Sequence, residues 1–125
     1  FNFIRDASVV VLVTDAADPS NDELSARLYK KIKKEFSPDI KILNLMNKED
    51  LLTPDQYSEA GRRAQQIAPE EKYFLVSALN NTNIGVAKNS IIEMCRENKN
   101  YKTTPKNTVA ISGSSVSHDN KKTCC

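Results

Sequence analysis

The sequence predicts an α/β fold in which three parallel strands alternate with three helices, followed by a tail without regular structure. Three short segments are apolar at almost every position, which is typical of strands covered on both faces of a parallel sheet. Each is followed by a segment with apolar residues at helical spacing. A strand–helix order repeated three times is the pattern of doubly wound α/β proteins.

The predicted strands are residues 8–14, 40–46 and 72–76. The first, Ser8 to Thr14, is apolar on both faces and has no earlier strand beside it in this sequence. Left unpaired, it would form a hydrophobic sheet edge, which favours aggregation. We therefore expect the sheet to continue before Phe1 and the chain to be a fragment or an incomplete product.

The first predicted helix begins with a capping box, in which Ser20 is the N-cap and Glu23 reaches back to it. It ends near Phe36, before Ser37-Pro38. Right-handed crossovers place this helix and the next on one face of the sheet if the strands step in one direction. Its expected inner stripe is Leu24, Leu28, Ile32 and Phe36.

The second predicted helix begins with Thr53 as N-cap, Pro54 in the first turn and Gln56 as partner, and it ends at Ala68-Pro69. Gly61 lies inside it, where glycine permits close packing at a cost of about 1 kcal/mol against alanine. Its expected inner face is Tyr57, Ala60, Ala64 and Ile67. The third helix begins near Asn83 and carries Ile84, Ala87, Ile91, Met94 and Cys95 at helical spacing.

Composition and charge exclude several classes. At 125 residues, with 39% hydrophobic and 27% charged residues, the chain is typical of one globular domain, and it contains no apolar run of membrane-spanning length and no signal peptide. Residues 1–98 have net charge −2 and residues 99–125 have net charge +4. A mildly acidic body argues against nucleic acid, while a basic tail suits an anionic membrane surface. The three cysteines form neither a disulfide framework nor a zinc pattern.

The second strand runs directly into Asn47-Lys48-Glu49-Asp50. Ligands of parallel α/β sheets bind beyond the carboxyl ends of the strands. A carboxylate at Asp50 can accept two parallel N–H bonds, from the ring N–H and the exocyclic amine of guanine. Adenine lacks this donor pair and would leave the carboxylate unpaired. Asn47 can donate and accept, and the Lys48 stem can lie on the base; the alternative is a polar turn.

The third strand ends in Ser77-Ala78-Leu79. Together with Asn47 to Asp50, these residues resemble the C-terminal part of a Ras-superfamily small GTPase, most like the Rab family. The resemblance implies a P-loop NTPase fold, with residues 1–98 as the C-terminal part of the domain. It also implies that the Ala78 backbone N–H donates to the guanine carbonyl. Leu79 stands where the family usually has lysine, so a charged stem near the base is lost.

The chain ends in Cys124-Cys125 after residues 99–125, a basic tail that we expect to be disordered. The plain alternative is an accidental pair of oxidation-prone thiols. The pair resembles the Rab-type terminus that accepts two geranylgeranyl groups. Two lipid chains anchor a protein stably to a membrane, whereas one chain does not. The resemblance implies prenylation machinery, exchange and activating factors, effectors, and a location on the cytoplasmic face of intracellular membranes with a soluble cytoplasmic pool.

The sequence contains no G-x-x-x-x-G-K-[ST] loop, and so no phosphate cradle and no Mg²⁺-binding hydroxyl of that motif. The resemblance therefore implies that a complete protein binds GTP/GDP with Mg²⁺ and hydrolyses GTP. It does not imply these activities for this chain alone. Two hypotheses remain open. One is a Rab-like molecular switch in vesicle trafficking, and the other is a prenylated interaction module without hydrolysis. Asp15 is expected to cap the turn after the first strand, with a ligand role as the alternative.

Overall fold

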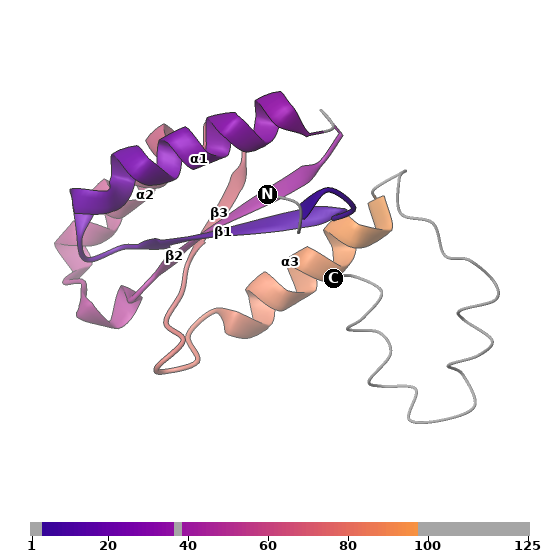
Figure 1. The fold of residues 1–125 in the computed structure, drawn as a ribbon. Helices are drawn as coiled ribbons and strands as arrows, with labels where there is room; N and C mark the ends of the chain where they lie inside the picture. Colours follow the sequence, from indigo (N-terminus) through magenta and orange to yellow (C-terminus); the bar gives the residue numbers. More distant parts are fainter. Residues whose placement is uncertain (1–3, 37–38, 98–125) are drawn as a thin grey trace, which may run out of the picture.

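The computed structural model describes residues 4–36 and 39–97, so the predictions for the tail, including Cys124 and Cys125, lie outside the described residues. Three strands form one sheet: β1 (Val9–Asp15), β2 (Lys41–Asn47) and β3 (Lys72–Leu75). They are parallel and lie in the order β1-β2-β3 (Figure 1). The predicted α/β class with three parallel strands alternating with helices is confirmed.

The strand register aligns the carboxyl ends of the sheet. Asp15, the last residue of β1, pairs with Asn47, the last residue of β2. Met46 pairs with Leu75, the last residue of β3. The three loops that follow the strands therefore begin at the same edge of the sheet, and residues far apart in sequence meet there.

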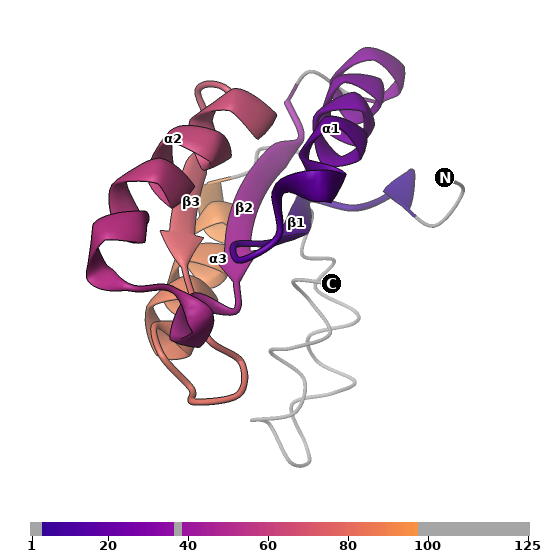
Figure 2. The same ribbon diagram turned by 90° about the vertical axis from the view of Figure 1, so that its left-hand side faces the viewer.

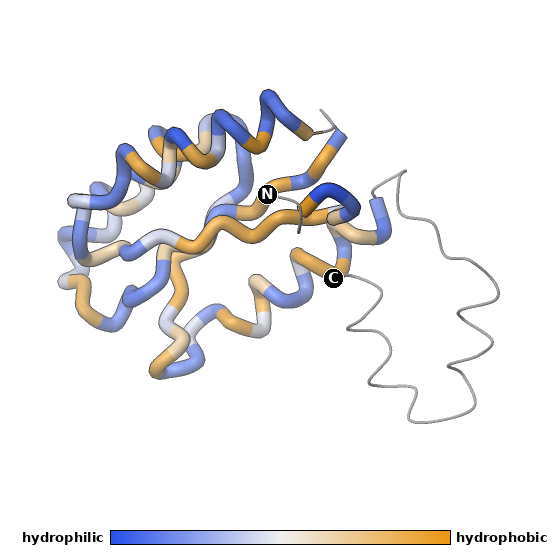
Figure 3. The backbone as a smooth tube through the Cα atoms, in the orientation of Figure 1, coloured by the Kyte–Doolittle hydropathy of each residue, from blue (hydrophilic) through white to orange (hydrophobic). Residues whose placement is uncertain are grey.

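The helices cover both faces of the sheet (Figures 1 and 2). Helices α1 (Asp22–Glu35) and α2 (Tyr57–Ile67) lie on one face, as right-handed crossovers in one direction require, and α3 (Ile84–Glu97) lies on the other. Figure 3 shows β1 as hydrophobic along most of its length. The core on the α1 and α2 face is Leu12, Ala16, Tyr29, Ile32, Ile40, Ile42, Met46, Ala64, Ile67 and Ala68.

The predicted start of the first helix is wrong. Ser20 is not an N-cap; it lies inside a 3₁₀ turn, η2 (Pro19–Asn21), whose N-cap is Asp18. The Ser20 N–H donates to Asp18 Oδ1 at 3.0 Å. Proline is preorganised for a first helical position, so Pro19 starts the helical turn before Ser20 can cap it. Asp18, directly before Pro19, supplies the acceptor that the sequence analysis assigned to Ser20.

The predicted inner stripe of this helix is also partly wrong. Leu24 is 60% exposed and Leu28 is 38% exposed, whereas Tyr29 and Ile32 are buried. The Tyr29 hydroxyl donates to the Pro69 carbonyl at 3.0 Å, which holds the Tyr29 face against the core. The neighbouring row of α1, through Leu24 and Leu28, consequently lies outside the core.

The second helix follows its prediction more closely. A 3₁₀ turn, η4 (Pro54–Gln56), leads into α2, and the Thr53 N–H donates to Gln56 Oε1 at 2.9 Å. Ala60, Ala64 and Ile67 are buried as predicted, but Tyr57 is 39% exposed and does not belong to the inner face. The close packing expected at Gly61 is confirmed. A Cβ atom there would lie 2.6 Å from the Tyr73 hydroxyl oxygen.

Helix α3 buries Ala87, Met94 and Cys95, which confirms the predicted face. Among the described residues β1 pairs on one side only, with β2, so it is an edge strand, as expected. Its outward residue Val13 is 59% exposed. Burial on both faces therefore holds for the central strand β2 and only partly for β1.

Candidate functional site

Asn47, Lys48 and Asp50 lie at the carboxyl edge of the sheet, as predicted. Strand β2 ends at Asn47, and the 3₁₀ turn η3 (Glu49–Leu51) follows at once. Lys48 joins the two in a left-handed conformation, with φ 70° and ψ 33°. The Lys48 side chain pairs with the end of β1, whereas the Asp50 side chain pairs with the residue Ser77 beyond β3. The motif thus spreads its side chains over all three strand ends.

Asp50 is oriented by Ser77, the second part of the predicted site. The buried Ser77 hydroxyl donates to Asp50 Oδ1 at 2.7 Å and accepts from the Asn80 N–H at 3.0 Å. Among the residues that the structure describes, no group donates to the second oxygen, Asp50 Oδ2. An ionised carboxylate offers about four lone-pair directions. The geometry therefore leaves acceptor capacity on a carboxylate whose orientation is already fixed.

Asn47 and Ala78 are also brought together. The Ala78 N–H donates to Asn47 Oδ1 at 3.1 Å. The resemblance assigned this N–H to a guanine carbonyl, and here it is engaged by the asparagine. Leu79 follows with 83% exposure, so its side chain packs against nothing substantial in this state. The asparagine amide must share or release the Ala78 N–H before a base carbonyl can accept from it.

The segment 77–83 holds these groups in a closed loop. Ser77 and Thr82 exchange both backbone hydrogen bonds, at 3.1 and 2.9 Å. Asn81 and Asn83 adopt positive φ angles of 61° and 58°, which asparagine tolerates better than most residues. The Asn83 side chain then donates to the Leu75 carbonyl at 2.8 Å. The loop is therefore fixed at both ends beside Asp50.

Asp15 caps the turn after β1, as predicted, and it also pairs with Lys48. Its Oδ1 accepts from the N–H groups of Ala17 at 2.8 Å and Asp18 at 3.2 Å, so it caps the turn as predicted. Its Oδ2 lies 2.8 Å from Lys48 Nζ. This hydrogen bond is the main reason that the pKa of Asp15 is lowered and that of Lys48 is raised. Sequence reasoning missed the pair, although aligned strand ends would have suggested it.

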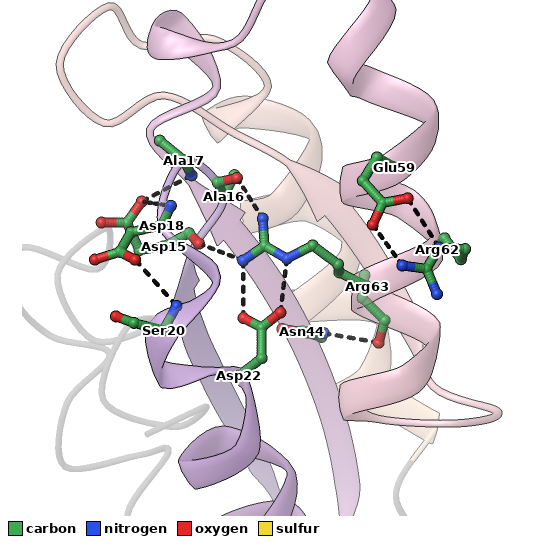
Figure 4. Close-up of polar contacts among 11 residues, drawn as sticks. Asp15, Ala16, Ala17, Asp18, Ser20, Asp22, Asn44, Glu59, Arg62 and Arg63 are labelled. Atoms are coloured by element: carbon green, nitrogen blue, oxygen red, sulfur yellow. Dashed lines mark hydrogen bonds and ion pairs between the residues drawn. The ribbon is translucent and has the colours of Figure 1, made fainter.

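Arg63 is a second residue that sequence reasoning missed. Its guanidinium is buried and forms a fork on Asp22, at 2.6 Å from Nε and 2.8 Å from Nη2 (Figure 4). It also donates to the carbonyls of Ala16 at 2.6 Å and Asp15 at 3.0 Å. Arg63 thus ties α2 to α1 and to the end of β1. Helical spacing is the signal that could have found it, because position 63 lies three residues after Ala60 and four before Ile67, on the buried side of α2, whereas Arg62 does not.

A hollow of about 210 Å³ lies beside Arg63. None of the predicted site residues lines it, so it is separate from the candidate base site. The described residues contain no group of three or more His, Cys, Asp or Glu that could hold a metal ion. The lining residues are Ala16, Ala17, Pro19, Leu52, Gln56, Glu59, Ala60 and Arg63.

No protein-family model matches this chain, and no curated protein matches it. Within residues 4–36 and 39–97, no helix is both long enough and apolar enough to cross a membrane. The fold and the site together define an α/β protein with a polar cluster of Asn47, Asp50, Ser77 and Ala78 at the carboxyl edge of its sheet.

Proposed function

We propose that this chain recognises guanine at the carboxyl ends of β2 and β3, as the base-binding part of a Rab-like small GTPase. The observation that carries the proposal is the Asp50 carboxylate. Ser77 fixes its direction through Oδ1, and no described group donates to Oδ2. Asn47 and the Ala78 N–H lie beside it, so acceptors and a donor are grouped at one place.

The complementarity is specific to guanine. The two carboxylate oxygens of Asp50 accept from the ring N–H and the exocyclic amine, and Oδ1 can accept a second bond beside that from Ser77. The Asn47 amide turns from Ala78 toward the base, and the freed Ala78 N–H donates to the guanine carbonyl. Adenine offers no such pair of donors to the carboxylate, and a buried acceptor left unpaired costs about 1–3 kcal/mol.

Phosphate and Mg²⁺ contacts do not come from these residues. The sequence has no G-x-x-x-x-G-K-[ST] loop. In this proposal GTP/GDP is bound with Mg²⁺ by a complete protein, and hydrolysis belongs to that protein. This chain supplies recognition of the base, and we expect its own affinity for nucleotide to be low.

The tail extends the proposal to membranes. Cys124 and Cys125 are the proposed sites of two prenyl groups, added by the prenylation machinery, and Lys121 and Lys122 precede them. Two lipids anchor a protein stably, and nearby lysines add attraction to an anionic leaflet. The protein would then act as a switch in vesicle trafficking on the cytoplasmic face of intracellular membranes. Exchange factors, activating factors and effectors would be its partners.

An NMR titration of the ¹⁵N-labelled chain with GMP and with AMP tests base recognition. The two ligands carry the same phosphate, so the comparison isolates the base. We expect GMP to shift the amide signals of Asn47, Asp50 and Ala78, and AMP to leave them in place. Equal shifts with both nucleotides, or no shifts with GMP, would contradict the proposal. The second result would favour the prenylated interaction module without hydrolysis.

A further inference from the structure

Lys48 forms its ion pair with Asp15 and not with Asp50, although Asp50 is only two residues away in the sequence. Lys48 and Asp50 are two residues apart, and an ammonium on a flexible four-carbon stem can pair with any carboxylate within its reach. In the structure Lys48 Nζ is 2.8 Å from Asp15 Oδ2, and Asp50 instead accepts from Ser77. The lysine is therefore turned toward β1 and away from the carboxylate proposed to read guanine.

Asp15 is itself held in place by contacts on three sides. Its Oδ1 accepts from two backbone N–H groups of the following turn, which leaves Oδ2 directed at the lysine. Its backbone carbonyl accepts from Arg63 Nη2 at 3.0 Å, and the neighbouring Ala16 carbonyl accepts from Nη1. Strand pairing places it opposite Asn47. An anchored carboxylate at this position is a better fixed partner than a mobile surface residue.

We propose that Asp15 is a positioning residue of the base site. It holds the Lys48 ammonium over the end of β1, extends the lysine stem across the place where the base lies, and keeps the ammonium from neutralising Asp50. The inference rests on the proposed guanine site and names a residue that the motif itself does not contain. Asp15 acts on the base only through Lys48.

The test compares Asp15→Asn with Asp18→Asn in the same GMP titration. Asparagine at position 15 keeps the Oδ1 acceptor for the turn but cannot form the ion pair. Asp18 caps the neighbouring 3₁₀ turn, and its charge acts on Lys48 without the 2.8 Å salt bridge that Asp15 forms, so Asp18→Asn makes the same charge change nearby and leaves that salt bridge in place. We expect Asp15→Asn to weaken GMP binding about five-fold, within the range of exposed ion pairs, and Asp18→Asn to leave it unchanged.

A double-mutant cycle shows whether the effect passes through Lys48. In a Lys48→Met background, Asp15→Asn should no longer change GMP affinity. An equal loss in both backgrounds would overturn the inference, because Asp15 would then act only on the local fold. A wild-type chain that binds GMP while Asp15→Asn binds it equally well would also overturn it. Failure of the wild-type chain to bind GMP would instead contradict the proposed function on which the inference rests.

Discussion

The Arg63 guanidinium bonds to three residues in two other parts of the chain, and its neighbour Arg62 pairs with one residue of its own helix. Arg63 is buried and bonds to Asp22 and to two carbonyls at the end of β1. Arg62 pairs with Glu59 on the surface of α2. Adjacent arginines on one helix thus differ in burial and partners, and they form a matched pair for measurement.

Arg63→Met should lower the free energy of unfolding by about 3 kcal/mol, because it leaves Asp22 without its buried counter-charge and two carbonyls without a donor. Arg62→Met should change it little, since exposed pairs contribute little. Urea unfolding of both variants measures the difference. Equal effects of the two substitutions would show that the Arg63 contacts do not stabilise the fold.

Tyr29 gives the fold a dependence on alkaline pH. Burial, followed by the charge of Glu71, raises the pKa of its hydroxyl to about 12. The folded state resists deprotonation of this hydroxyl more than the unfolded state does. The contribution of Tyr29 to the free energy of unfolding is therefore complete below pH 10 and is lost as the pH rises from 10 toward 12. Relative to Tyr29→Phe, which cannot ionise, the wild-type chain should lose on the order of 2 kcal/mol over this range. A constant difference in unfolding free energy between pH 8 and 12 would contradict this.

At the scale of elements, α2 and β3 are in close contact at Gly61. A Cβ atom there would lie 2.6 Å from the Tyr73 hydroxyl oxygen and 3.4 Å from the ring carbon that bears it. The hydroxyl is at the end of a rigid ring, so the ring or the helix has to move. Glycine fits this contact despite its low helix propensity, because it has no Cβ atom.

Gly61→Ala should therefore destabilise the chain, although alanine favours a helix by about 1 kcal/mol. In a Tyr73→Phe background, where the hydroxyl is absent, the same substitution should become neutral or stabilising. Thermal unfolding of the wild-type chain, the two single variants and the double variant measures this change of sign. If Gly61→Ala has the same effect with and without the Tyr73 hydroxyl, the close contact does not determine the energy.

The strands were predictable from sequence because each is a short apolar run, and the structure shifts each strand end by at most one residue. The inner face of α1 was not fully predictable. Apolar residues occupy two adjacent rows of this helix, and packing selects Tyr29 and Ile32 over Leu24 and Leu28. The Asn47 and Asp50 part of the site followed from its position after a strand. The Lys48 pair with Asp15 depends on strand register, which periodicity does not give. Helical spacing places Arg63 on the buried side of α2, but its partners on α1 and at the end of β1 come from tertiary packing.

At the scale of the whole molecule, the described residues and the sequence after them have separate proposed tasks. The described body groups the residues proposed to read guanine, and the sequence after it is basic and ends in Cys124-Cys125. A lipid anchor contributes about 0.8 kcal/mol per buried CH₂, so one twenty-carbon chain outweighs two lysines at about 1 kcal/mol each. The proposal therefore predicts an order of importance within the tail.

In cells that express the protein, Cys124→Ser with Cys125→Ser should abolish membrane association. Lys121→Ala with Lys122→Ala should only weaken or redistribute it, because salt-screened attraction is secondary to the lipids. Fractionation into membrane and cytosol measures both variants. Retention of the double cysteine variant on membranes would show that the tail attaches through a protein partner.

The specificity of Asp50 is the central claim, and the nucleotide preference of Asp50→Asn tests it most directly. An amide at this position places a donor opposite the guanine donors and suits xanthine, whose exocyclic group is an acceptor. Asp55→Asn, a nearby exposed residue, is the matched control. By NMR titration, the wild-type chain and Asp55→Asn should prefer GMP over XMP. Asp50→Asn should reverse the preference, with GMP affinity at least about ten-fold lower, because one of the two acceptors facing guanine becomes a donor opposite a donor. Unchanged GMP affinity in Asp50→Asn would contradict guanine recognition by this site.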